Sequence, residues 1–148
     1  MPVLVMNQQM ISVQTKMLRQ AGNRLLRVEQ LYAAEVSVLL TNDDVVHDLN
    51  HRYRGYDKPT DVLSFAQRDH LPGTPPAPKL PGIPDPLGDV IISVDTAQRQ
   101  AAAHGVTLNQ ELALLTVHGI LHLLGYVDDT DEGAECMRVR EREILGTP

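Results

Sequence analysis

The stretch 112-LALLTVHGILHLL-124 is apolar at nearly every position. A helix that is apolar on all sides has no polar face to present to water, so it belongs inside a protein and not on its surface. We therefore expect a helix that starts near Thr107 or Asn109, reaches about Leu124 and lies in the middle of the molecule. The other elements are expected to cover it.

The segments around this helix show a mixture of strand and helix patterns. Short apolar runs with polar flanks predict four strands, at residues 3–6, 35–41, 62–65 and 89–93. Helical spacing predicts four further helices, at about 10–30, 43–54, 95–104 and 132–145. The first of these is interrupted at 21-AGN-23, where we expect an end or a bend. This order predicts an α+β fold, in which about five helices cover a small mixed sheet of about four strands.

Length and proline content define the domain organisation. The 148 residues match one ordinary globular domain, so we expect a single domain over 1–148. Seven of the ten prolines lie between residues 67 and 86. Because proline restricts the backbone and removes a hydrogen-bond donor, this segment is predicted to be an exposed loop.

Composition excludes several classes of function. A net charge of -6 argues against a protein that binds nucleic acid with its whole surface, and four Tyr, one Phe and no Trp leave few rings for base stacking. The single cysteine excludes an internal disulfide and a cysteine-rich zinc site. The amino-terminal segment has no basic start and only a short apolar run, so we expect neither a signal peptide nor a membrane anchor, and a cytoplasmic location.

Two histidines stand out in the apolar helix. His118 and His122 are four residues apart, so their side chains project from the same face. Burying each imidazole without a partner would cost roughly 1–3 kcal/mol. A divalent metal such as zinc would satisfy both, since such a pair can supply two neighbouring ligands. On spacing alone, two core histidines that bind backbone carbonyls or a carboxylate remain an equally good interpretation.

The residues after the histidines favour the metal site. The full string has the form H-x-x-x-H-x-x-G-x-x-D, in which Gly125 can end the helix and turn the chain so that Asp128 faces the histidines. Metzincin proteases use the same geometry, with histidine as the usual third ligand. Two histidines and a carboxylate leave one coordination position open, which is typical of a catalytic zinc site. Asp129 and Asp131 are alternative third ligands if the loop is shifted.

One residue weakens a protease interpretation. In the H-E-x-x-H motif, the glutamate after the first histidine is the general base, and here that position is Gly119. Peptide cleavage by the usual route is therefore disfavoured, although a zinc-dependent peptidase stays open as an alternative.

A local group of cations follows the helix at 43–54. Arg52, Arg54 and Lys58 lie within seven residues of an otherwise acidic chain. Arginine can hold a phosphate with two hydrogen bonds, and lysine can act as a point charge. These residues are candidate phosphate-binding groups; the alternative is a solvated helix end whose cations complement the helix dipole. Asp61 and Ser64 are assigned no chemistry.

Three motifs together resemble one family. The sequences 53-YRGYDKPTDVLSF-65, 87-LGDVIIS-93 and 118-HGILHLLGY-126 are similar, in content and order, to those of the YbeY family of bacterial rRNA-maturation endoribonucleases. The resemblance implies a compact α/β fold, a zinc ion held by three histidines, and cleavage of single-stranded RNA during 16S rRNA 3′-end maturation and ribosome quality control. It also implies contact with the small ribosomal subunit. His118 and His122 match the first two metal ligands, and Arg54 matches the functionally important arginine.

The chain departs from the family pattern at three positions. The family usually continues G-Y-D-H, whereas this chain reads Gly125-Tyr-Val-Asp128, and Ala66 replaces a usual proline. Asp128 occupies the third ligand position, so we expect one Zn²⁺ ion, with Fe(II) or Mn(II) also acceptable to two histidines and a carboxylate.

The expected reaction is RNA cleavage with Arg54 as the catalytic residue and Lys58 or Arg52 as substrate-binding helpers. The nucleophile is either water activated by the metal or the RNA 2′-hydroxyl. A non-catalytic ribosome-assembly factor is the second alternative, because a small basic patch can also bind a protein partner.

Overall fold

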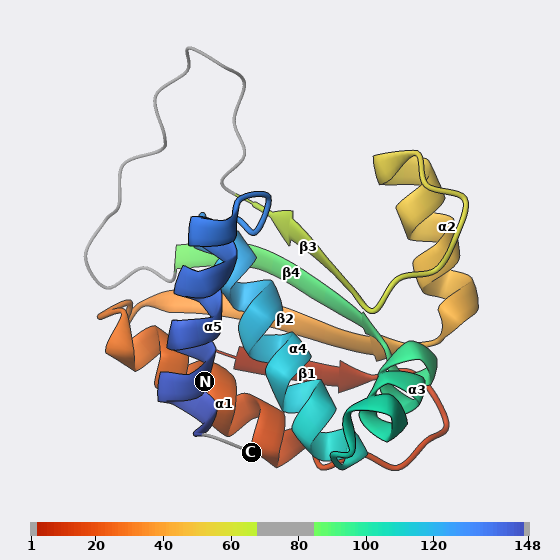
Figure 1. The fold of residues 1–148 in the computed structure, drawn as a ribbon, viewed down its shortest axis with the longest axis horizontal. Helices are drawn as coiled ribbons and strands as arrows, with labels where there is room; N and C mark the ends of the chain where they lie inside the picture. Colours follow the sequence, from red (N-terminus) through yellow and green to blue (C-terminus); the bar gives the residue numbers. More distant parts are fainter. Residues whose placement is uncertain (1–2, 68–84, 147–148) are drawn as a thin grey trace.

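A four-stranded mixed sheet forms one layer of the structure (Figure 1), a computed structural model that describes residues 3–67 and 85–146. The strands are β1 (Val3–Asn7), β2 (Ala34–Thr41), β3 (Val62–Ala66) and β4 (Asp85–Ser93). Their spatial order is β1-β2-β4-β3, with β3 antiparallel at one edge and the other pairs parallel. Five helices complete the described residues, namely α1 (Thr15–Val28), α2 (Asp43–Arg54), α3 (Val94–His104), α4 (Leu108–Leu123) and α5 (Asp131–Leu145). The predicted α+β fold with four strands and five helices is confirmed.

Helix α4 lies where its sequence predicts. It packs against α1, α3 and α5 as well as against β3 and β4 (Figure 1), and ten of its sixteen residues are buried. A capping box begins it: the Thr107 side chain accepts from the Gln110 N–H, and the Gln110 side chain accepts from the Thr107 N–H. This helix is therefore the central element that holds the two histidines.

The expected interruption at 21-AGN-23 is wrong. Helix α1 runs through it, because Gly22 is a packing residue and not a breaker. A Cβ atom at Gly22 would lie 3.0 Å from Val3 Cγ2 and 3.1 Å from Ile120 Cδ1. The missing side chain lets α1 approach β1 and α4 closely.

Strand β4 begins earlier than its apolar run predicts. The structure starts it at Asp85, and not at Asp89, so two residues of the expected loop belong to the sheet. Pro86 pairs with Glu35 of β2, and the register between the two strands shifts directly after this pair. Proline is tolerated at such an irregularity. The rest of the proline-rich segment, residues 68–84, lies outside the described residues.

Helix α2 covers the opposite side of the β3 edge from α4. Its N-cap, Asn42, accepts a hydrogen bond from the Val45 N–H, and Gly55 ends it in a left-handed conformation with φ of 77°. The helix contacts α3, β3 and β4. Among the described residues, no helix is long and apolar enough to cross a membrane.

Candidate metal centre

His118, His122 and Asp128 lie together at the end of α4. The two Nε2 atoms are 3.1 Å apart, and Asp128 Oδ2 lies 3.6 Å from each of them. The chain reverses at Gly125, whose φ is 99°, and the Tyr126 N–H then bonds back to the Leu121 carbonyl. This glycine turn brings Asp128 to the histidines. Within the described part of the chain, the alternative ligands Asp129 and Asp131 do not join this cluster, and Asp131 is the first residue of α5.

The chemistry of the three side chains suits a divalent cation. His118 Nδ1 lies 2.8 Å from Glu141 Oε1, and His122 Nδ1 lies 3.0 Å from the Tyr126 carbonyl oxygen. With the Nδ1 protons held by these acceptors, the imidazoles would offer both Nε2 lone pairs to a cation beside the Asp128 carboxylate. Tetrahedral zinc with bonds of about 2.0–2.1 Å would separate its ligands by about 3.3–3.4 Å, close to the observed separations. The three residues therefore fit one zinc-sized ion, and the 50% exposed Asp128 side chain leaves the site open to solvent.

Glu141 changes the electrostatics of the first histidine. Its hydrogen bond raises the pKa of the His118 imidazole above the usual value, while burial opposes this shift. The charges of Glu141, Asp128 and Asp61 raise it further. The same negative environment favours a cation at Nε2, because a carboxylate on Nδ1 increases the basicity of the ring.

Replacing Glu141 with alanine is expected to weaken metal binding by about 10–100-fold, the usual effect of losing a residue that orients a metal ligand. Glu141→Gln should lose less affinity, since its amide oxygen still accepts the Nδ1 proton. Competition with a chromophoric chelator measures the dissociation constant. Glu135→Ala is the matched control, because Glu135 lies on the same helix and pairs on the surface with Arg138. Unchanged affinity in Glu141→Ala would contradict the orienting role.

A second group of contacts fixes the loop after α4. The Tyr126 hydroxyl donates to Glu29 Oε1 over 2.7 Å, and Arg140 Nε lies 3.2 Å from the same oxygen. The hydrogen bond to Glu29 and burial raise the pKa of Tyr126, so the hydroxyl keeps its proton. These contacts attach the loop to α1 and α5. They also hold the Tyr126 carbonyl where it accepts from His122.

Sequence reasoning missed Glu141, Glu29 and Tyr126. One signal for Glu141 exists: it lies at helical spacing between Met137 and Ile144, the two buried residues of α5. A charged residue on the buried face of a helix needs a partner. Glu29 and Tyr126 bond to each other across 97 residues of sequence, and no local pattern indicates this contact.

Strand β3 links the predicted phosphate-binding residue Arg54 to the helix that carries the histidines. Arg54 Nη2 donates to the Ser64 carbonyl over 3.2 Å, and Ser64 Oγ donates to the Gly119 carbonyl over 2.9 Å. Gly119 adjoins His118, so one strand residue links the arginine to the histidine helix. Ser64, to which the sequence assigned no chemistry, therefore contacts both Arg54 and the histidine helix.

The other two predicted cations are farther from this link. Arg52 is exposed and pairs with Asp48 one turn earlier, with 3.2 Å between Nε and Oδ2. Lys58 lies with Nζ 5.8 Å from the centre of the Tyr56 ring. Of the three cations, Arg54 is the one connected to the histidine helix through the contacts of Ser64 described above.

Gly119 also explains why the protease glutamate is missing. A Cβ atom there would lie 2.5 Å from Val90 Cγ1 and 3.3 Å from Ser64 Oγ. This position faces β4 and has no space for a side chain. The general base of an H-E-x-x-H peptidase therefore has no place at this position, which counts against the peptidase alternative.

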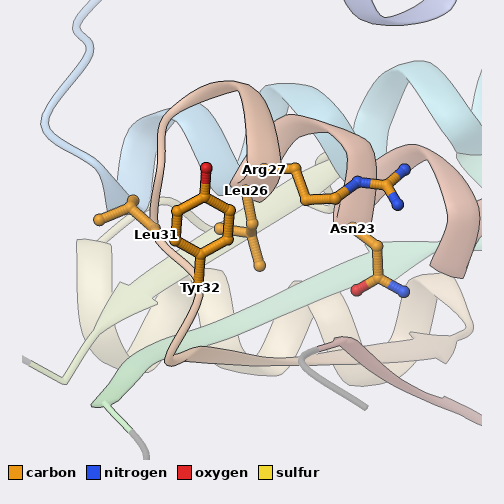
Figure 2. Close-up of a pocket in the computed structure, with 5 residues that line it drawn as sticks. All are labelled: Asn23, Leu26, Arg27, Leu31 and Tyr32. Atoms are coloured by element: carbon orange, nitrogen blue, oxygen red, sulfur yellow. The ribbon is translucent and has the colours of Figure 1, made fainter. Parts of the chain in front are cut away.

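A separate hollow lies beside α1 and the turn that follows it. Figure 2 shows its lining residues, Asn23, Leu26, Arg27, Leu31 and Tyr32. None of them belongs to the candidate metal centre or to the cations near β3. Tyr32 there is 74% exposed.

The fold and this geometry place the chain among α+β proteins that carry two histidines and a carboxylate, in metal-binding geometry, at the end of a buried helix. The sequence matches the family described as Endoribonuclease YbeY over residues 4–147. The chain belongs to this family.

Named relatives agree with this assignment, and one solved structure shares the fold. The Endoribonuclease YbeY of Pelotomaculum thermopropionicum is 44% identical over 151 residues, covering 99% of this chain and 96% of that protein. The Endoribonuclease YbeY of Moorella thermoacetica is 54% identical over 112 residues, covering 76% of this chain and 71% of that protein. The solution structure of a Thermotoga maritima protein shares the fold, with a TM-score of 0.61 at 24% identity over 97% of this chain and 89% of that one.

Proposed function

We propose that this chain is a metal-dependent endoribonuclease that cleaves single-stranded RNA and acts as one domain over residues 1–148. Its relatives named Endoribonuclease YbeY support the activity. The observation that carries the proposal is the closeness of His118, His122 and Asp128, with Arg54 across β3. Its proposed cellular role is cytoplasmic maturation of the 16S rRNA 3′ end and ribosome quality control on the small subunit.

Each side chain has a definite task in this proposal. His118, His122 and Asp128 would hold one divalent ion, which supplies Lewis acidity and stabilises negative charge when bound. Glu141 and the Tyr126 carbonyl keep the imidazoles in the Nδ1–H tautomer. Arg54 donates to the scissile phosphate and neutralises the charge that develops in the transition state. Arg52 and Lys58 attract neighbouring phosphates.

The central experiment follows cleavage of a single-stranded RNA before and after chelation, and after return of Zn²⁺, Mn²⁺ or Fe²⁺. We expect cleavage to stop with the chelator and to resume with a metal. An unstructured peptide serves as the competing substrate. Unchanged RNA cleavage without metal, or cleavage of the peptide alone, contradicts the proposal. Small-subunit binding that survives chelation, with no RNA cleavage under any condition, would instead identify the non-catalytic assembly factor.

The nucleophile can be identified with a modified RNA. A single 2′-deoxy nucleotide at the cut position removes the 2′-hydroxyl and leaves the phosphate intact. If cleavage at that position stops, the 2′-hydroxyl is the nucleophile. If it continues, the nucleophile is water.

Arg54→Ala is expected to lower the cleavage rate at saturating RNA by about 10²–10³-fold, the usual effect of removing one donor to a charged transition state. Arg54→Lys should recover only part of the rate, because lysine cannot make two parallel hydrogen bonds. Metal content should stay unchanged in both variants. Arg138→Ala on α5, which pairs with Glu135, is the control. A normal rate in Arg54→Ala would remove the arginine from the mechanism.

A further inference from the structure

Aromatic side chains are scarce in this protein, and most of them gather at one place. The chain has four Tyr and one Phe. Three of these five rings, Tyr53, Tyr56 and Phe65, lie on the end of α2, the loop after it and strand β3. Tyr53 is 67% exposed and Tyr56 is 58% exposed. Both tyrosine rings are therefore accessible to a ligand.

The rings are held in a defined arrangement. Tyr53 and Phe65 meet edge to face, with ring centres 5.5 Å apart and planes at 71°. This geometry is favourable for aromatic pairs, and it orients the exposed Tyr53 ring. Tyr56 lies under the Lys58 ammonium group, 5.8 Å from it. Tyr53 is therefore positioned before any ligand arrives.

The rings also lie beside the proposed phosphate-binding group. Tyr53 and Arg54 are consecutive on α2, and they contact consecutive residues of β3: the Phe65 ring and the Ser64 carbonyl. Side chains alternate between the two faces of a strand. Because the Ser64 hydroxyl faces α4, Phe65 and its partner Tyr53 lie on the opposite face. Arg54 thus lies between the ring pair and the histidine helix.

We propose that Tyr53, supported by Phe65 and flanked by Tyr56, is a stacking platform for one unpaired base of the RNA whose phosphate Arg54 holds. This inference rests on the proposed function and adds the reason for single-strand preference. A base stacks on a protein ring only when it has left its own helical stack, which duplex RNA does not allow. A protein of net charge -6 would also need its cations, Arg52, Arg54 and Lys58, at this place to attract a polyanion.

The same surface argues against a protein partner as the primary ligand. Tyrosine and arginine are common in protein interfaces, but lysine and aspartate are depleted there. Here the rings alternate with Arg52, Arg54 and Lys58 along residues 52–58. Rings interleaved with cations are typical of single-strand nucleic-acid sites, where each stacked base contributes sequence-independent affinity.

The test compares one fluorescent single-stranded RNA with the same RNA carrying a single abasic nucleotide, moved position by position. Anisotropy gives the affinity of the metal-loaded protein and, in parallel, of the chelator-treated protein, in which cleavage is expected to stop. At one position, loss of the base should weaken binding by about 5–150-fold, the range for one base stacked on an aromatic ring. Tyr53→Leu should bind intact RNA with the same loss and show no further loss at that position.

Three variants keep the result interpretable. Tyr53→Phe retains the ring and should keep base-dependent binding. If the Tyr53 hydroxyl were the group that matters, this variant would lose it. Tyr32→Leu removes an equally exposed tyrosine from the hollow in Figure 2 and should bind RNA normally. Arg54→Ala should weaken the binding of intact and abasic RNA alike. It should also reduce the slope of log affinity against log salt concentration by about 0.7.

The inference is overturned if Tyr53→Leu binds intact RNA normally, or if it loses affinity while the penalty for the missing base persists. The second result would indicate a packing role or a ligand other than a base. RNA cleavage without base-dependent binding contradicts only this inference. Base-dependent binding without cleavage supports it and contradicts only the proposed function.

Discussion

Replacing His122 with alanine is expected to lower metal affinity by about 100-fold or more, and RNA cleavage should be lost with the metal. The change leaves His118 and Asp128 as the remaining side-chain ligands of the cluster. Loss of a ligand should exceed the 10–100-fold effect expected for a residue that only orients one. Elemental analysis after dialysis measures retention of the ion, and the absorption spectrum of the Co²⁺-substituted protein reports the ligand geometry independently of activity.

Three further variants test whether the effect is specific to the ligand cluster. His47→Ala is the control, because His47 is a partly exposed residue of α2 that pairs with Asp57 and lies outside the cluster. It should keep both metal and cleavage. Asp128→His restores the ligand type usual in the family and should retain the metal, whereas Asp128→Ala should weaken it. Full metal retention by His122→Ala would contradict the assignment of the site.

Gly119→Ala is expected to destabilise the protein by up to about 2 kcal/mol. Alanine gains about 1 kcal/mol in helix propensity over glycine, but overpacking a core costs ~1–3 kcal/mol. The new Cβ would lie 2.5 Å from Val90 Cγ1, in a place where Val90 is fully buried. Gly119→Glu, which would complete an H-E-x-x-H motif, should be worse because it also forces a carboxylate against the sheet. Urea unfolding measures the free energy of each variant.

A double-mutant cycle with Val90→Ala tests the contact directly. Val90→Ala alone leaves a cavity and destabilises the protein. Combined with Gly119→Ala, the smaller residue makes room for the new methyl group, so the double variant should be more stable than the sum of the single effects predicts. Additive effects would show that Val90 is not the residue that excludes a side chain at position 119.

The sequence was sufficient for features that depend on local periodicity. The buried helix follows from an unbroken apolar run, and the proximity of His118 to His122 follows from the helical repeat. The α2 start at Asn42 follows from side-chain capping. The turn at Gly125 was also predictable, because a glycine directly after an apolar helix commonly ends it in a left-handed conformation.

Features that depend on contacts between distant segments were not predictable. A glycine such as Gly22 gives the same local signal whether it breaks a helix or lets another element approach, and only Val3 and Ile120 decide between the two. The first residues of β4 belong to the strand because β2 pairs with them, not because of their own apolar pattern. Ser64 likewise acquires its role from Gly119, 55 residues away.

The position of β3 at the edge of the sheet has a consequence for solubility. An edge strand presents unpaired backbone groups that can recruit a strand from another molecule, and proteins commonly guard such edges with a positive charge. Arg54 guards the β3 edge in this way, because its guanidinium donates a hydrogen bond to the outward-facing carbonyl of Ser64. The arginine proposed to meet the RNA backbone therefore also protects a short apolar strand from intermolecular aggregation.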